Sequence, residues 1–282
     1  MADMPSHSFG REIANVLLRV VAVLVCFVLI LGLGNVWLEE QMLSDGSCNI
    51  AVIPIEGIIM PYGDYTEDDL IVNPSLVRSY LEWIQDDPFI EGILFEINSP
   101  GGAPVAAEAI AEMIDQNPLP TVGLIGDLGA SGGYLVAAAT DYLIASPMST
   151  VGSIGVSMSY LDNTIQNENE GLTFVELAAG EFKEAGNPNR PLTDEERERF
   201  ERDLDIVHDA FIDTVAGYRD LPREEVAAVS DGYAYIGRDA LEKRLIDALG
   251  GRTTAQQHFA ETLSKPAEDI VFCEYVASEW WL

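Results

Sequence analysis

The sequence has very little positive charge. Its 282 residues include 15 Lys and Arg against 47 Asp and Glu, for a formal net charge of −32 at pH 7. Binding to nucleic acid through phosphate neutralisation needs many lysines and arginines, so the composition excludes a nucleic-acid partner. The same shortage argues against attraction to anionic lipid headgroups. Only three of the positive residues are lysines, Lys183, Lys243 and Lys265.

The acidic excess needs a physical explanation. In ordinary salt, uncompensated negative charges repel one another and destabilise a compact chain. In molar salt the screening length falls to about 3 Å, and most of this repulsion disappears. We therefore expect a salt-loving (halophilic) source. The alternative is an acidic protein that its charge keeps soluble.

Cysteine and histidine are also scarce. None of the three cysteines forms a CxxC pair, so a zinc site is unsupported and no metal or cofactor is expected. Cys48 and Cys273 can pair as a disulfide outside the cytoplasm or remain as two free buried thiols, and the sequence leaves both open. The three histidines, at positions 7, 208 and 258, lie in no motif, which argues against a Ser–His–Asp triad.

One long apolar run lies near the N-terminus. Val20–Trp37 has a single polar side chain, Asn35, and as a helix it would span about 27 Å, close to the thickness of the hydrocarbon core. A cleaved signal peptide is the competing interpretation, but no small-x-small cleavage site follows the run. We expect a retained signal anchor at residues 16–37, after a short N-terminus at 1–15 and before a linker at 38–49.

The flanking charges predict the orientation of this anchor. Arg11 and Arg19 precede the apolar run, and no Lys or Arg follows it until Arg78. By the positive-inside rule the N-terminus faces the cytoplasm and the catalytic part is extracellular. The first 37 residues have no net charge, so the whole excess of −32 lies on the exported part.

The sequence of the exported part predicts one α/β domain. Strands are predicted at Ile50–Glu56, Ile90–Ile97, Thr121–Gly126 and Tyr142–Ala145, and helices at Pro74–Asp86, Ala103–Gln116, Tyr134–Ala139 and Leu192–Tyr218. The last helix begins with a capping box, formed by Thr193 and Glu196. Strands and helices that alternate at short intervals indicate a parallel sheet with helical crossovers.

Two glycine-rich turns follow predicted strands. Asn98–Gly102 (NSPGG) and Gly129–Gly133 (GASGG) match neither a P-loop nor a GxGxxG fingerprint. Either turn alone would be an ordinary tight connection. Together they present Ser131 between small residues, with backbone N–H groups nearby that can hold an oxyanion. Ser131 is therefore a candidate nucleophile for acyl transfer.

A nucleophilic serine needs a base, and lysine is a known alternative to histidine. Lys183 lies in the segment GEFKEAG and taken alone would be a surface lysine. To act as a base it must be neutral, which requires burial or neighbouring positive charge. Ser153, in TVGSIG, is a candidate for orienting the amine.

These residues resemble the signal peptide peptidase A family, serine proteases with a Clp-protease/crotonase-like fold. The resemblance covers about residues 50–251, the expected peptidase domain, and leaves residues 252–282 as a C-terminal extension. It rests on five ordered segments, namely NSPGG at 98–102, GASGGY at 129–134, TVGSIGV at 150–156, GEFKEAG to NRPLTDEER at 180–197, and DGYAYIGRDALEKRLIDALG at 231–250.

The resemblance implies roles for single residues. Ser131 is the expected nucleophile and Lys183 the expected general base, and Ser153 is expected to form a hydrogen bond with the lysine. The N–H groups of Gly132 and of either Gly101 or Gly102 would form the oxyanion hole, and the sequence does not distinguish between the two. The implied fold is a repeated ββα superhelix with a mainly parallel sheet.

The resemblance also implies partners and substrates. The resemblance to single-domain members implies a dome-shaped ring of subunits in which Ser and Lys come from adjacent subunits. The implied substrates are released signal peptides and other apolar peptides. Three alternatives remain: a related protease that cleaves membrane-scaffold proteins, a crotonase-like acyl-CoA enzyme, and a catalytically inactive membrane scaffold.

Overall fold

The computed structural model describes residues 18–27, 46–63 and 70–274. The chain divides into two units, residues 1–47 and residues 48–282, which are treated separately. Residues 18–27 form a helix. The rest of the anchor expected at 16–37 lies outside the described residues. Within the described part of the chain, no helix is both long enough and apolar enough to cross a membrane.

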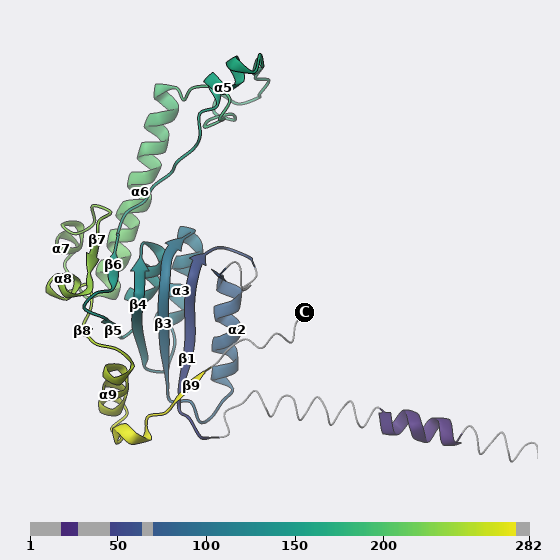
Figure 1. The fold of residues 1–282 in the computed structure, drawn as a ribbon, viewed down its shortest axis with the longest axis vertical. Helices are drawn as coiled ribbons and strands as arrows, with labels where there is room; N and C mark the ends of the chain where they lie inside the picture. The colour runs from purple at the N-terminus through teal and green to yellow at the C-terminus, as the bar shows by residue number, and fades with distance from the viewer. Residues whose placement is uncertain (1–17, 28–45, 64–69, 275–282) are drawn as a thin grey trace, which may run out of the picture. The chain divides into compact units, whose positions relative to one another are not determined.

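The second unit is built on a nine-stranded sheet (Figure 1). Its strands are β1 (Ile50–Ile59), β2 (Ile71–Val72), β3 (Gly92–Gly102), β4 (Thr121–Ala130), β5 (Tyr142–Ala145), β6 (Thr150–Gly152), β7 (Ala234–Ile236), β8 (Ala248–Leu249) and β9 (Phe272–Glu274). The main order is β2-β1-β3-β4-β5-β8, with β6 beside β4, β7 beside β6, and β9 beside β1. All these pairings are parallel except β6 with β7. The expected α/β class with a parallel sheet is confirmed.

Helices connect the strands. They are α2 (Pro74–Gln85), α3 (Pro104–Asp115), α4 (Gly132–Ala138), α5 (Thr164–Asn169), α6 (Asp194–Tyr218), α7 (Arg223–Ala227), α8 (Gly237–Glu242) and α9 (Arg252–Thr262). The start of α2 shows the local cause: Asn73 caps the helix by accepting a hydrogen bond from the N–H of Leu76 at 3.0 Å, and Pro74 occupies the first helical position, where a missing N–H costs nothing.

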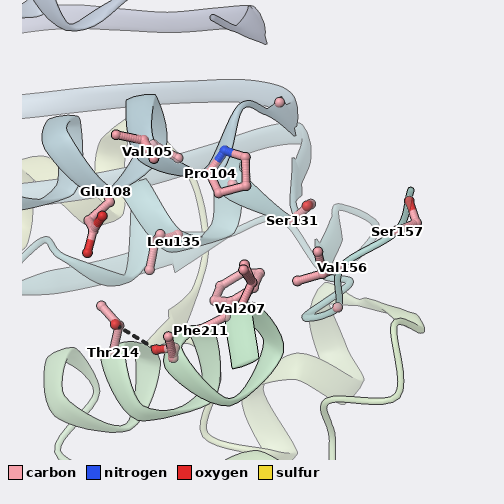
Figure 2. A pocket seen from close by; sticks show the side chains of 15 residues that line it. Pro104, Val105, Glu108, Ser131, Leu135, Val156, Ser157, Val207, Phe211 and Thr214 are labelled. Carbon is pink, nitrogen blue, oxygen red and sulfur yellow. Dashed lines mark hydrogen bonds between the residues drawn. The ribbon is translucent and has the colours of Figure 1, made fainter. Parts of the chain in front are cut away.

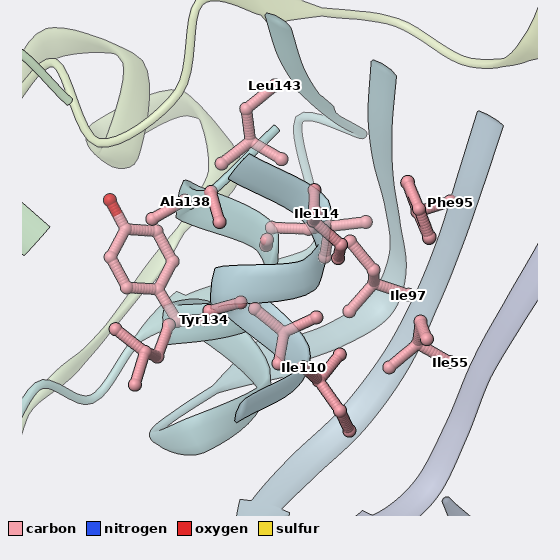
Figure 3. Packing of buried hydrophobic residues seen from close by; sticks show 14 of the residues in the cluster. Ile55, Phe95, Ile97, Ile110, Ile114, Tyr134, Ala138 and Leu143 are labelled. Carbon is pink, nitrogen blue, oxygen red and sulfur yellow. The ribbon is translucent and has the colours of Figure 1, made fainter. Parts of the chain in front are cut away.

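Alternating residues of each strand pack on opposite faces of the sheet. On one face Ile55, Phe95 and Ile97 pack against Ile110 and Ile114 of α3, within the larger core cluster (Figure 3). The opposite face carries a smaller cluster, made mainly by Ile50, Val52, Leu94, Val122, Ile144, Ala255, Phe259 and Ile270. The sheet is therefore buried on both faces over part of its length, as its long runs of Ile, Leu and Val predict.

The long helix α6 begins with the predicted capping box. Thr193 accepts from the N–H of Glu196 at 3.2 Å, and the Glu196 carboxylate accepts from the N–H of Thr193 at 3.0 Å. The buried residues of the second half of the helix are Ile212 and Val215. Figure 1 shows the other end of α6 reaching the segment that carries α5.

The C-terminal segment joins the sheet. Residues 252–282, expected as an extension of the peptidase domain, supply α9 to the smaller cluster and β9 to the edge of β1. Within β9, Cys273 forms a disulfide with Cys48, with 5.5 Å between the two Cα atoms. Of the two possibilities that the sequence left open, the structure has the paired one.

We predict that breaking this disulfide lowers the stability of the second unit. Cross-linking two residues 225 positions apart restricts the unfolded chain, an effect of about 2–5 kcal/mol. The double change Cys48→Ser and Cys273→Ser should therefore lower the melting temperature, measured by circular dichroism, and added reductant should have no further effect on it. Cys26→Ser is the matched control, because Cys26 is an exposed free thiol. Equal melting temperatures for the parent and the double variant would contradict the pairing.

Candidate functional site

The two glycine-rich turns lie side by side because β3 pairs with β4. The parallel register runs from Ile93 opposite Thr121 to Ser99 opposite Gly129, so both strands end at the same edge of the sheet. Register shifts interrupt β1 before Ile58 and the β3–β4 pair before Ser99. Such irregularities re-aim the chain at the end of a strand. Here they bring NSPGG against GASGG.

Ser131 has an unusual backbone at the end of β4. Its φ is 53° and its ψ is −127°, a region that costs a non-glycine residue about 1–3 kcal/mol. Three hydrogen bonds hold it there. Its N–H donates to the carbonyl of Gly152 at 2.8 Å, and its carbonyl accepts from the N–H groups of Tyr134 and Leu135 at 2.9 and 3.0 Å. Its side chain makes no capping bond to α4, so the hydroxyl is free to react.

Only glycine fits at position 101. Gly101 has a φ of 92°, and a Cβ there would stand 2.6 Å from the backbone nitrogen of Gly132. A Cβ on Gly132 would in turn be 3.4 Å from the nitrogen of Gly102. The backbone nitrogens of the two turns therefore lie close together.

A buried serine distinguishes the two glycine N–H groups. Ser99 is fully buried, donates its hydroxyl to the carbonyl of Gly57 at 2.6 Å and accepts the N–H of Gly101 at 3.1 Å. Gly102 stands opposite Ile59, whose carbonyl accepts from Ala103 at 2.8 Å. In a parallel ladder this leaves the N–H of Gly102 directed away from β1.

Ser153 follows β6, next to the turn that carries Ser131. Gly152, the acceptor of the Ser131 N–H, immediately precedes it. The Ser153 hydroxyl donates to the carbonyl of Gly232 at 3.0 Å, and its N–H donates to the carbonyl of Tyr233 at 3.0 Å. One protomer therefore brings Ser131, Ser153 and the three glycines together.

A pocket opens beside Ser131 (Figure 2). It has a volume of about 230 Å³ and lies between α3, α4, α6 and the extended residues that follow Ser153. Its walls combine apolar side chains, from Val105, Leu135, Val156, Val207 and Phe211, with polar groups that include Glu108 and Thr214. The site can accept a side chain of a peptide whose backbone passes over Ser131.

Within one protomer, Lys183 lies outside the pocket beside Ser131. It is exposed, does not line the pocket, and makes no hydrogen bond or ion pair with Ser131. The neighbouring Phe182 stacks under the guanidinium of Arg199, 3.8 Å from the ring centroid. Arg199 precedes Val207 of the pocket by eight residues, about 12 Å along a helix. The fold of one chain therefore separates the two expected catalytic side chains.

Arg190 fastens the segment that carries Lys183. Its guanidinium donates to both carboxylate oxygens of Glu196 at 2.6 and 2.9 Å, and also to Glu176 at 3.0 Å and to the carbonyl of Glu184 at 3.0 Å. The Arg190 charge and the capping bonds lower the pKa of Glu196 to about 2, so the carboxylate remains ionised above that pH. The segment is thus held against the start of α6.

Neither described histidine approaches Ser131. His258 stacks on Tyr142 with ring centroids 3.8 Å apart, and burial lowers its pKa. His208 does not line the pocket, and His7 lies outside the described residues. Among the described residues, no group of three or more His, Cys, Asp or Glu side chains is placed to hold a metal ion.

Ser131, Gly102 and Gly132 were predicted site residues, but no sequence motif indicates the helical residues that complete the pocket. Val207, Phe211 and Thr214 come from α6, and Val105 and Glu108 come from α3. The spacing of four between Val207 and Phe211 places them on one face of a helix, but that pattern also fits an ordinary core face. Only the packing of α6 beside α3 assigns them to a pocket.

Comparison with known proteins adds an independent observation. Residues 114–265 match Peptidase family S49. A protein of Methanocaldococcus jannaschii named as a protease is 31% identical over 217 residues, which cover 74% of this chain and 70% of the relative. A protein of Enterococcus faecium named as a signal peptide peptidase SppA is 30% identical over 261 residues, 88% of this chain and 75% of the relative. Protease 4 of Haemophilus influenzae is 27% identical over 241 residues, 82% of this chain and 37% of the relative.

The family match includes the turn that carries Ser131 and the segment of Lys183. The matches agree with the resemblance that the five sequence segments predict. The chain belongs to peptidase family S49 and is a serine peptidase related to the signal peptide peptidase A proteins.

Proposed function

We propose that this serine peptidase is a membrane-anchored endopeptidase that uses Ser131 and Lys183 to hydrolyse released signal peptides and other apolar peptides outside the cytoplasm. The observation that carries the proposal is the strained backbone of Ser131 beside a pocket with several apolar side chains. The fold is then a Clp-protease/crotonase-like ββα superhelix, expected at residues 50–251, to which α9 and β9 of the following segment add.

The oxyanion hole follows from the two turns. The N–H of Gly132 and the N–H of Gly102 are its donors, because Ser99 already accepts the N–H of Gly101. Preorganised backbone donors stabilise the negative charge that develops on the substrate carbonyl in the transition state. Ser99 holds the first turn in place through the carbonyl of Gly57.

The chemistry proceeds in two stages. The Ser131 Oγ attacks the carbonyl carbon of the substrate while neutral Lys183 takes the hydroxyl proton. The tetrahedral intermediate collapses with cleavage of the C–N bond, and the leaving amine takes the proton from Lys183. In the second stage neutral Lys183 takes a proton from water, and the oxygen of that water attacks the acyl-enzyme carbonyl. The ester bond to Ser131 then breaks, and Lys183 returns the proton to the Ser131 Oγ as the acid product leaves.

Lys183 acts on Ser131 of an adjacent copy in a ring-shaped homo-oligomer. Two observations support this arrangement. The two residues are separated within one chain, and the segment between them exposes large apolar side chains, among them Leu161, Ile165, Val175 and Leu177. Apolar surface of this extent commonly marks an interface with another protein chain, and a second copy would cover it. Ser153 then orients the incoming amine.

The location outside the cytoplasm is supported by the disulfide, since such bonds persist in oxidising compartments. The anchor at 16–37 with a cytoplasmic N-terminus is supported by its apolar length and flanking arginines.

The alternative within the family is a protease that cleaves membrane-scaffold proteins, and a catalytically inactive scaffold is the alternative outside it. Labelling of Ser131 by a fluorophosphonate separates an active enzyme from the scaffold.

We expect Ser131→Ala to abolish peptide hydrolysis without unfolding the protein. The change removes a hydroxyl at a turn and alters no core volume. Hydrolysis of unstructured apolar peptides by the detergent-solubilised protein measures the first effect, and thermal unfolding measures the second. Turnover near the parental rate would refute the assignment of the nucleophile.

Lys183→Arg should be as inactive as Lys183→Ala, because a guanidinium stays protonated at any working pH and cannot take a proton. The other two lysines provide matched controls. Lys243 lies over the ring of Tyr235 and Lys265 pairs with Glu91, so Lys243→Arg and Lys265→Arg should remain active. Substantial activity in Lys183→Arg would eliminate the Ser–Lys pair.

Mixing two inactive proteins tests the shared site. Ser131→Ala protomers still supply Lys183, and Lys183→Ala protomers still supply Ser131, so mixed assemblies should recover part of the activity. Recovery is measured against each variant alone after mixed assembly has been confirmed by pull-down of differently tagged protomers. Mixed assemblies without recovered activity would show that both residues act within one chain.

Salt should raise both stability and activity. The excess of −32 repels itself in dilute buffer, and molar salt screens that repulsion. We expect the melting temperature and the rate of peptide hydrolysis to rise between low and molar potassium chloride. Full stability in dilute buffer would argue against a halophilic source while leaving the peptidase assignment intact.

A further inference from the structure

The pocket beside Ser131 has an acidic end. Glu108 lies four residues after Pro104 on α3 and faces the same pocket as Ser131. Among the described residues, no hydrogen bond or ion pair engages its carboxylate. Figure 2 shows Glu108 and Thr214 at one end of the pocket and Ser131 toward the other. The pocket therefore has walls of mixed apolar and polar character, and an exposed carboxylate makes one end negatively charged.

Thr214 adds to the acceptor character of that end. Its hydroxyl donates to the carbonyl of Ala210 at 2.8 Å, so only its oxygen lone pairs are available to a ligand. An ionised carboxylate is likewise only an acceptor. A ligand group that satisfies both must donate hydrogen bonds, and the carboxylate favours one with a positive charge.

The length of the pocket suits a long side chain. Glu108 lies four positions after Pro104 on α3, about 6 Å along the helix axis, and Pro104 comes just after the first glycine-rich turn. The apolar stem of a lysine or arginine can lie against Val105, Leu135 and Phe211 while its charged end reaches Glu108. A shorter apolar side chain could contact the walls but would leave the exposed Glu108 carboxylate to water.

We propose that Glu108 makes this pocket selective for peptides with lysine or arginine at the residue whose carbonyl Ser131 attacks. The proposal rests on the proposed function and narrows its substrate class from apolar peptides to peptides that carry a basic residue at the cleaved bond. The acidic surface of the chain acts in the same direction, since a negative potential raises the local concentration of cationic ligands.

The test compares peptides that differ only at this residue. Lysine is paired with norleucine, which has the same four-carbon stem and no amine, and arginine is paired with citrulline, which keeps the shape and loses the charge. At one fixed salt concentration, the full chain in detergent should cleave the lysine peptide with a kcat/KM about tenfold above that of norleucine, in keeping with one charged hydrogen bond.

Two variants locate the effect. Glu108→Gln keeps the side-chain shape and should bring the lysine-to-norleucine ratio close to one. Glu112→Gln is the matched control: Glu112 lies one turn further along α3, accepts from Gln116 at 2.9 Å, and does not line the pocket. It should leave the ratio unchanged. A parental ratio of one or below, or a ratio that survives Glu108→Gln, would overturn the proposal.

A binding measurement keeps this test separate from the chemistry. The same peptides are titrated into Ser131→Ala protein with and without Glu108→Gln, and fluorescence anisotropy gives the two dissociation constants. Tighter binding of the lysine peptide that depends on Glu108 supports the proposal even if Ser131 proves not to be the nucleophile. Equal binding of the lysine and norleucine peptides refutes it even if Ser131 is the nucleophile.

Discussion

The parallel pairing of β3 with β4 is the constraint on which the site depends. Parallel strands end at the same edge of a sheet, so one ladder brings both glycine-rich turns to one place. The close approach of Gly101 to Gly132 and the position of Ser131 both depend on this pairing. A shift of register by one residue would separate Ser131, the proposed nucleophile, from the backbone N–H groups of the first turn.

The unfavourable backbone of Ser131 is maintained by its surroundings. Its N–H is held by Gly152 of β6, which pairs with both β4 and β7. Behind the turn, Tyr134 is fully buried and donates its hydroxyl to the carbonyl of Leu245 at 2.8 Å. Burial raises the pKa of that hydroxyl, which keeps it a neutral donor. Segments from three parts of the chain thus stabilise one strained residue.

The segment that carries Lys183 is stabilised by polar contacts and not by a buried core. It is fastened by polar bonds around Arg190 and Glu196 at the start of α6, and its apolar side chains are largely exposed. A buried core supports the proposed nucleophile, whereas a charged cluster supports the segment of the proposed base. This contrast fits a site in which one half is rigid within the protomer and the other half is presented to a neighbour.

Local sequence determined much of this protein. Alternating apolar runs predicted the main strands and helices, and the Thr193–Glu196 capping box predicted the start of α6, because these features depend on neighbouring residues alone. The short strands β2, β6, β7, β8 and β9 were not predicted, since strands of two or three residues have too few side chains to show a period. Tertiary pairing alone stabilises them.

The candidate site divides in the same way. The motifs around Ser131, Lys183, Ser153 and the glycines are readable in the sequence because each is a short contiguous segment. Three outcomes required the tertiary structure: the pairing of Cys48 with Cys273, the engagement of the Gly101 N–H by Ser99, and the pocket between α3 and α6. Each depends on distances between residues far apart in the chain, and no local pattern encodes such distances.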